Sequence, residues 1–386
     1  MPVIDSRCVM RRSLAAGAAV GAAALSLRAL ARPLPTEERR LLDWEQVRRV
    51  AHARSGERGP TEVDVVGARL GVDYDAVAAQ LAPLMAEVCG EPVHGFPSFT
   101  VLDRRGFIDR NLVIVRRLIE PVERLRAGLP ESRVTALGRG LGSRYLGELL
   151  GFLSKRVLGQ YDPVLMLAPP ALDQTAEPSA LYLVEPNVDV FARRHAAPAE
   201  PLRRWLILHE LTHAWQFEAH PWLRDHLGEL MRELLQSELL GRLADAGAGS
   251  AGGRSGMSTT SLMRLLPATV RTQLRVASRI QAVMSVLEGY SNFVMHRVGR
   301  GHIADFERLE RSFHARSVQR PPLERVVLRA TGLSMKMRQY ELGERFSEAV
   351  VRRAGLDTLN RIWEGPAAMP SLDELNSPDR WLARVA

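Results

Sequence analysis

The chain has 386 residues, of which 46% are hydrophobic and 25% are charged, as in ordinary globular proteins. Its net charge is +8, but nearly all of the cations are arginines interleaved with acidic residues, and no long basic run occurs. This pattern is typical of solvated helix faces, so we expect no nucleic-acid partner. Only Cys8 and Cys89 are present, which excludes a disulfide framework and a thiolate metal site.

The N-terminus resembles an export signal. Arg11 and Arg12 precede an uncharged run rich in Ala and Gly that ends at Leu27, and Ala29-Leu30-Ala31 follows. Paired arginines, a weakly apolar stretch and an A-x-A end are typical of a twin-arginine-like leader. The run is shorter than the ~20 residues that span a bilayer. We therefore predict a signal over residues 1–31 and a location outside the cytoplasm or in the cell envelope; the alternative is a cytoplasmic protein with an uncleaved arm.

After the leader, the sequence predicts one domain over residues 36–386. Its first part, residues 36–160, has helical patterns of apolar residues. Asp73 has the position of an N-cap, and Pro121 is expected to kink the helix that contains it. Helices are predicted over residues 41–53, 73–88, 107–129 and 133–158.

The second part, residues 161–386, combines a small β element with further helices. Two short apolar runs, residues 164–167 and 181–184, predict strands beside the next helix. Residues 246–261 contain many Gly and Ser residues and predict a flexible surface loop. Helices are expected on both sides of that loop, and no second segment is long and apolar enough to span a membrane. The fold class is therefore mainly α (α+β).

The segment His209-Glu210-Leu211-Thr212-His213 is the strongest functional signal. It lies in an apolar stretch that Pro201 opens as a helix. Residues four apart lie on the same helix face, so His209 and His213 could both bind one zinc ion at about 2.0 Å. Glu210 would then be close enough to take a proton from a water at the metal. The alternative, a solvated face without a metal, is disfavoured by the apolar flanks.

A catalytic zinc usually has three protein ligands, so a third must come from elsewhere. Glu288 is the one charged residue between Gln281 and Met295, and burying it requires a partner. A metal would be that partner; the alternative is an ion pair with Arg279 or Arg297.

Other residues near the motif are weaker candidates. His220 is one residue out of place for the extended metzincin pattern, which also requires Gly at the position of Gln216. Asn292 could hold the second nitrogen of a ligand histidine. His226 and Tyr290 could donate hydrogen bonds to an oxyanion, although a structural role suits each better.

The sequence resembles a family of bacterial zincin-like hydrolases associated with deazaflavin coenzyme biosynthesis. The resemblance covers roughly residues 40–386, and the leader and the glycine-rich loop depart from it. It is carried by residues 206–217, Pro221-Trp222-Leu223, Asp43-Trp44, residues 103–107, residues 158–162, Leu287-Glu288-Gly289, residues 336–340, Gly343, Phe346 and residues 378–385. The resemblance implies a zincin-type fold and a gluzincin-like site of His209, His213 and Glu288, with Glu210 as the base.

Together these patterns predict a zinc-dependent metallohydrolase, of the gluzincin peptidase type, that acts on a peptide or another amide. A non-catalytic, zinc-stabilised binding or scaffold protein is the alternative. The sequence does not define the substrate, the cleavage preference or the oligomeric state.

Overall fold

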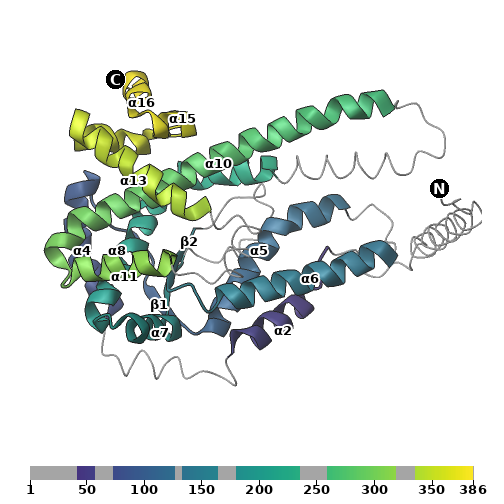
Figure 1. The fold of residues 1–386 in the computed structure, drawn as a ribbon, viewed down its shortest axis with the longest axis horizontal. Coiled ribbons are helices and arrows are strands. Elements are labelled where there is room, and N and C mark those ends of the chain that lie inside the picture. The colour runs from purple at the N-terminus through teal and green to yellow at the C-terminus, as the bar shows by residue number, and fades with distance from the viewer. Residues whose placement is uncertain are drawn as a thin grey trace, which may run out of the picture. The chain divides into compact units, whose positions relative to one another are not determined.

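The computed structural model describes residues 41–56, 73–126, 133–163, 180–234, 259–318 and 335–385. In this part of the chain the fold is mainly helical with one three-stranded sheet, as predicted (Figure 1). The leader over residues 1–31 and the first predicted strand, residues 164–167, lie outside the described residues. None of the described helices is both long and apolar enough to cross a membrane.

The chain divides into two compact units, residues 1–57 with 108–154 and residues 58–107 with 155–386. Helix α5 (Arg104–Arg126) begins in the second unit and continues into the first. It continues as a helix past Pro121, where we expected a kink. The prediction of one domain over residues 36–386 stays a prediction.

In the first unit, helix α2 (Trp44–Ser55) packs along α6 (Arg133–Leu153). Asp43 caps α2 through the backbone amide of Gln46. Two glycines of α6 allow the close approach, because a Cβ at Gly147 would lie 2.7 Å from Val50 Cβ and one at Gly151 would lie 2.4 Å from Arg54 Cβ. This unit supplies none of the residues of the predicted metal site.

The second unit holds the sheet and the remaining helices. They are α4 (Tyr74–Cys89), β1 (Phe99–Leu102), β2 (Gly159–Asp162), β3 (Ala180–Val184), α7 (Glu185–His195), α8 (Ala199–Glu218), a helix over residues 222–234, α10 (Thr259–His302), α11 (Phe306–Val318), α13 (Met335–Ala354), α14 (Leu356–Asn360), a 3-10 turn (Arg361–Glu364), α15 (Leu372–Asn376) and α16 (Pro378–Val385). Asp73 caps α4 as predicted.

The sheet has the order β1-β3-β2, with β1 parallel and β2 antiparallel to β3. The central strand β3 confirms the predicted strand at residues 181–184, and its apolar residues are buried. Strand β2 was not expected, because Gly-Gln-Tyr-Asp shows no apolar alternation; its pairing with β3 makes it a strand. Helix α6, which we predicted to end at Leu158, ends at Leu153, before β2 begins.

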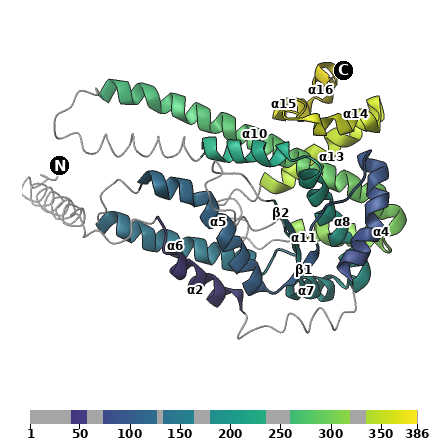
Figure 2. The same cartoon turned by 180° about the vertical axis from the view of Figure 1, so that it is seen from behind.

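Helix α8 lies at the centre of this unit and packs against α4, α10 and β2. Most of its residues are buried, so most of its surface contacts other parts of the protein. Figure 2 shows α4 and α8 side by side, seen from behind. A helix in this position can hold polar side chains only where they bind one another or a ligand.

Helix α13 crosses the long helix α10 at a pair of glycines. A Cβ at Gly343 would lie 1.8 Å from the carbonyl oxygen of Ser285, and one at Gly289 would lie 2.2 Å from the Gly343 carbonyl carbon. The two backbones therefore touch directly beside Glu288. Helix α10 begins at Thr259, inside the predicted loop 246–261; the rest of that loop lies outside the described residues.

Candidate metal centre

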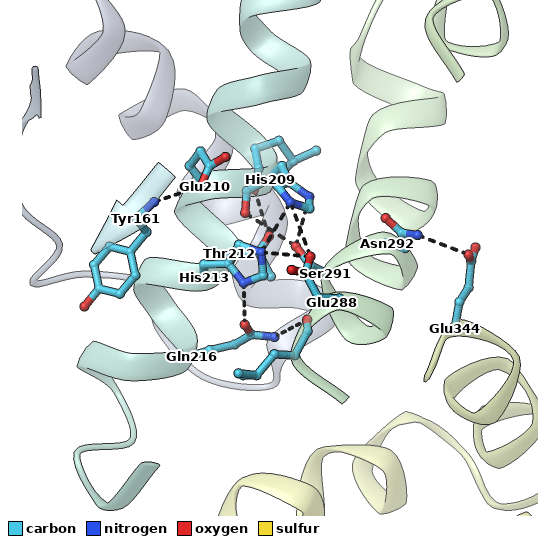
Figure 3. A network of polar contacts seen from close by, with 12 residues as sticks. Tyr161, His209, Glu210, Thr212, His213, Gln216, Glu288, Ser291, Asn292 and Glu344 are labelled. Atoms are coloured by element: carbon cyan, nitrogen blue, oxygen red, sulfur yellow. Dashed lines mark hydrogen bonds and ion pairs between the residues drawn. The ribbon is translucent and has the colours of Figure 1, made fainter. Parts of the chain in front are cut away.

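Three predicted ligands from two helices come together in the structure. His209 and His213 lie one turn apart on α8, and Glu288 faces them from α10 (Figure 3). The two His Nε2 atoms are 3.2 Å apart, and Glu288 Oε2 lies 3.6 Å from His213 Nε2 and 3.9 Å from His209 Nε2. Among the described residues, these three form the one group of His, Cys, Asp or Glu whose donor atoms could hold a metal.

The triangle of donor atoms has the size that a zinc ion requires. With bonds of about 2.0–2.1 Å, tetrahedral ligands lie roughly 3.3 Å apart. The observed edges of 3.2, 3.6 and 3.9 Å are close to that value. Two imidazoles and one carboxylate are also ligands that zinc prefers, so the residues fit the ion.

Glu288 is buried, with 4% of its surface exposed, in the uncharged part of α10. The two arginines considered as alternative partners have other neighbours. Arg279 Nη1 lies 3.4 Å from Glu233 Oε2, and the guanidinium of Arg297 lies over the ring of Phe293. The Glu288 carboxylate lies within ion-pair distance of both histidines.

The electrostatics of the centre favour a cation. Burial by itself would lower the pKa of His213, but the hydrogen bond and the charge of Glu288 raise it above the usual value, with smaller contributions from Glu210 and Gln216. A positive charge is thus stabilised at the point where the three donor atoms converge. The negative charge of Glu288 would also attract a divalent ion at that point.

The second nitrogen of each histidine has a hydrogen-bond partner. Gln216 Oε1 lies 2.9 Å from His213 Nδ1, and Gln216 Nε2 donates to the carbonyl oxygen of Leu287 at 3.0 Å. Ser291 Oγ lies 3.3 Å from His209 Nδ1. When Nδ1 carries the proton, Nε2 is left to bind a metal.

Sequence reasoning missed both of these positioning residues. The sequence pattern singles out Gln216 only as the residue at the position of a metzincin glycine, although a polar residue in an apolar helix is itself a signal. Asn292, which we expected to hold a histidine, instead donates from Nδ2 to Glu344 Oε2 at 3.4 Å. Its neighbour Ser291 is the residue that faces His209.

The side chain of Glu210 extends from α8 toward strand β2 of the sheet and is buried. Its Oε2 accepts a hydrogen bond of 2.9 Å from the backbone amide of Tyr161 in β2 (Figure 3). A Cβ at Gly159 would lie 3.2 Å from Glu210 Cγ and Oε1, so β2 approaches the carboxylate closely. The strand that was not expected from the sequence is therefore the element that orients Glu210.

The weaker candidates have other partners. His220 Nε2 lies 3.2 Å from Glu91 Oε1, and its Nδ1 lies 3.2 Å from the carbonyl oxygen of Gln216. The Tyr290 hydroxyl donates to Asn360 Oδ1 at 2.8 Å. The ring of His226 packs near Trp222, and burial lowers its pKa. The structure assigns none of these three to the metal centre.

Comparisons with known proteins agree with this geometry. A crystal structure of a candidate hydrolase described as having a novel fold, from Chloroflexus aurantiacus, is 33% identical in sequence, with a TM-score of 0.64. The alignment covers 89% of this chain and 98% of that one. A search of curated proteins found no match.

The family comparison covers most of the chain. The zincin-like metallopeptidase family matches residues 42–382, a range that includes the two histidines, Glu210 and Glu288. That family implies a metal, typically zinc, and the three donor atoms supply a place for one. The chain belongs to the zincin-like metallopeptidase family.

Proposed function

We propose that the protein is a zinc-dependent hydrolase of the gluzincin type that cleaves peptide or other amide bonds. His209, His213 and Glu288 would hold the zinc. When bound, zinc supplies a positive charge that lowers the pKa of a coordinated water to about 7 and polarises the scissile carbonyl. The observation that carries the proposal is the convergence of the donor atoms of His209, His213 and Glu288, with Glu210 on the same helix as the histidines and held by β2.

Glu210 would act as the general base and then as the general acid. Its Oε2 accepts a hydrogen bond from the Tyr161 amide, which fixes the carboxylate that would accept the proton of the attacking water. The same carboxyl group would pass that proton to the leaving amine when the C–N bond breaks. Burial of Glu210 limits competition from bulk water during this transfer.

The edge strand β2 supports a peptide as the substrate. The amide of Val184 donates to the carbonyl oxygen of Leu158, so the backbone groups of the alternate residue Gly159 point away from β3. The Tyr161 amide lies on the same edge but donates to Glu210. An extended peptide could pair with this edge and place a carbonyl beside Glu210. Oligomeric state and cleavage preference do not enter this proposal.

The test replaces Glu210 by Gln in the full-length protein. We expect the variant to keep stoichiometric zinc, measured by elemental analysis, and to lose hydrolysis of a fluorescent peptide library by at least ~100-fold, because the base is gone. The matched control is Glu200→Gln, an exposed acid on the first turn of the same helix. Unchanged turnover in Glu210→Gln would contradict the mechanism.

A wild-type protein that contains stoichiometric zinc but hydrolyses no substrate would instead favour a non-catalytic, zinc-stabilised scaffold. Two further expectations belong to the proposal. Export through residues 1–31 predicts that the leader is absent from protein recovered from the cell envelope. The association with deazaflavin coenzyme biosynthesis, which the sequence resemblance implies, stays a prediction.

A further inference from the structure

A cavity that shares no lining residue with the metal centre lies between α10 and α13. It has a volume of about 540 Å³, which is within the usual range of small-molecule sites. It is lined by Phe293, His296, Arg297, Arg300, Glu348, Val351 and Arg352. The proposed hydrolase mechanism uses none of these residues.

The lining comes from one face of each helix. Phe293, His296, Arg297 and Arg300 are spaced by three and four residues along α10, and Glu348, Val351 and Arg352 repeat that spacing on α13. The glycine pair at the helix crossing holds the two faces against each other. The cavity is therefore built by the rigid part of the fold and not by a loop.

The residues that line the cavity include more cations than acids, and the three arginines are exposed. Three guanidinium groups, those of Arg297, Arg300 and Arg352, face one carboxylate, that of Glu348. Within the described part of the chain, none of these arginines forms an ion pair. Arg353, the next residue along α13, does: its Nη1 lies 3.2 Å from Asp379 Oδ1. Basic residues are common in the last turn of a helix, but that preference does not direct three of them into one cavity.

One of the three guanidinium groups is held in place by an apolar surface. Arg297 Cζ lies 5.1 Å from the centre of the Phe293 ring, one turn earlier on α10. Such stacking restricts the side chain before a ligand arrives, so less conformational entropy is lost on binding. Phe293 is itself buried and forms part of an apolar floor with Val351.

His296 also lines the cavity, but both of its ring nitrogens already have acidic partners. Its Nε2 lies 2.6 Å from Glu310 Oε1 and its Nδ1 lies 2.5 Å from Glu344 Oε1. Both ring nitrogens thus face carboxylates, and these two acids exceed the charge of a protonated ring by one negative charge. The arginines are the cations that remain for a ligand.

We propose that this cavity binds a small organic anion. Its carboxylate or phosphate group would contact the guanidinium groups of Arg297, Arg300 and Arg352, and its apolar part would lie against Phe293 and Val351. Arginine presents paired N–H donors that match both kinds of anionic group. The adjacent apolar surface of Phe293 and Val351 favours the binding of an organic anion over that of an inorganic one.

The test is isothermal titration of the full-length protein with phenyl phosphate, benzoate and inorganic phosphate. We expect saturable binding of phenyl phosphate or benzoate that is tighter than that of inorganic phosphate. Whichever organic probe binds more tightly identifies the anionic group. Arg300→Gln and Arg352→Gln should each weaken binding roughly fivefold or more, because a charge-assisted hydrogen bond is lost. The matched control is Arg353→Gln, which lies in the same turn of α13 outside the cavity.

Each titration is repeated after treatment with a chelator, because an anion could also bind a metal ion. Binding that survives chelation and depends on Arg300 and Arg352 supports the proposal. Three results overturn it: no saturable binding of any probe, equal weakening by Arg353→Gln, or loss of binding on chelation. Circular dichroism of each variant confirms that the comparison is made between folded proteins.

Discussion

Helix α10 carries two clusters of histidine and glutamate with opposite compositions. In the metal centre one carboxylate, Glu288, faces two histidines. Two turns further on, one histidine, His296, lies between the carboxylates of Glu310 and Glu344. Donor atoms in the first cluster converge on one point, whereas those in the second already pair with the histidine ring.

The comparison indicates that the ratio of histidines to carboxylates determines whether a cluster can bind a metal ion. Protonated His296 donates one N–H to each acid, at 2.5 and 2.6 Å. The hydrogen bond to Glu344 is the largest effect that raises the pKa of His296, and the charge of Glu344 and the contact with Glu310 raise it further. In the metal centre, two nitrogens and one oxygen lie 3.2 to 3.9 Å apart, which suits an ion bound between them.

The largest effect is expected from removing the carboxylate of the metal centre. Glu288→Gln should reduce zinc affinity by more than ~100-fold, because even residues that only orient a ligand contribute 10- to 100-fold. Zinc affinity is measured by competition with a chromogenic chelator. Glu310→Gln, in the second cluster, serves as the control. An equal loss of zinc affinity in both variants would show that the two clusters do not differ in their contribution to zinc binding.

The next effect concerns the residue that orients His213. Gln216→Leu should reduce zinc affinity by about 10- to 100-fold, since it removes the acceptor for Nδ1 and the link to Leu287. The zinc affinity of this variant is measured by the same chelator competition as for Glu288→Gln. Asn292→Leu, which loses only the contact with Glu344, should leave affinity unchanged. A larger loss of zinc affinity in Asn292→Leu than in Gln216→Leu would show that Asn292, and not Gln216, supports the metal ligands.

The crossing of α10 and α13 offers a test of packing beside Glu288. Gly289→Ala should lower the free energy of unfolding by about 1–3 kcal/mol, because the new methyl group overlaps the backbone at Gly343. Urea denaturation measures the change. Gly301→Ala is matched on the same helix, where a Cβ meets nothing within 4 Å, and should be neutral or stabilising. A neutral Gly289→Ala would mean that the helices can separate without cost.

The smallest effect is the pH dependence of the second cluster. Because the folded-state pKa of His296 is raised, its stabilisation is present below the unfolded-state value of about 6.5 and is lost as pH rises through the folded-state pKa. Arg297, Arg300, Arg352 and Glu348 line the same cavity and add to the charge around it.

His296→Gln should therefore lower the free energy of unfolding on the order of 1 kcal/mol at pH 6 and by less at pH 9. Urea denaturation at the two pH values measures this difference. His302→Gln, at the exposed end of α10, is the control and should show no such difference. If the loss of unfolding free energy in His296→Gln increased with pH, His296 would not be protonated in the folded protein at pH 6.

Local patterns were enough to predict several parts of this protein. The spacing of His209, Glu210 and His213 defines a helix face, because a helix repeats every 3.6 residues wherever it lies. Asp73 caps its helix through neighbouring backbone amides, and the apolar run at residues 181–184 forms the central strand. The mainly α class with a small sheet follows from such patterns, and the family comparison agrees with it.

Contacts between distant segments were not predictable in the same way. Gln216 and Ser291 acquire their positions beside the histidines only when α8 and α10 pack together. Strand β2 has no strand pattern of its own, yet its pairing with β3 places the Tyr161 amide on Glu210. The approach at Gly289 and Gly343 depends on backbones that are far apart in sequence.

The sequence by itself determined which residues could form the metal centre, since helix periodicity and the cost of a buried acid are local properties. Tertiary structure decided how they are oriented and what surrounds them. Glu288 reaches the two histidines because α10 packs on α8, and the arginine-lined cavity exists because α13 packs on α10. The physical reason is that orientation and burial come from packing between helices, which spacing along one helix does not encode.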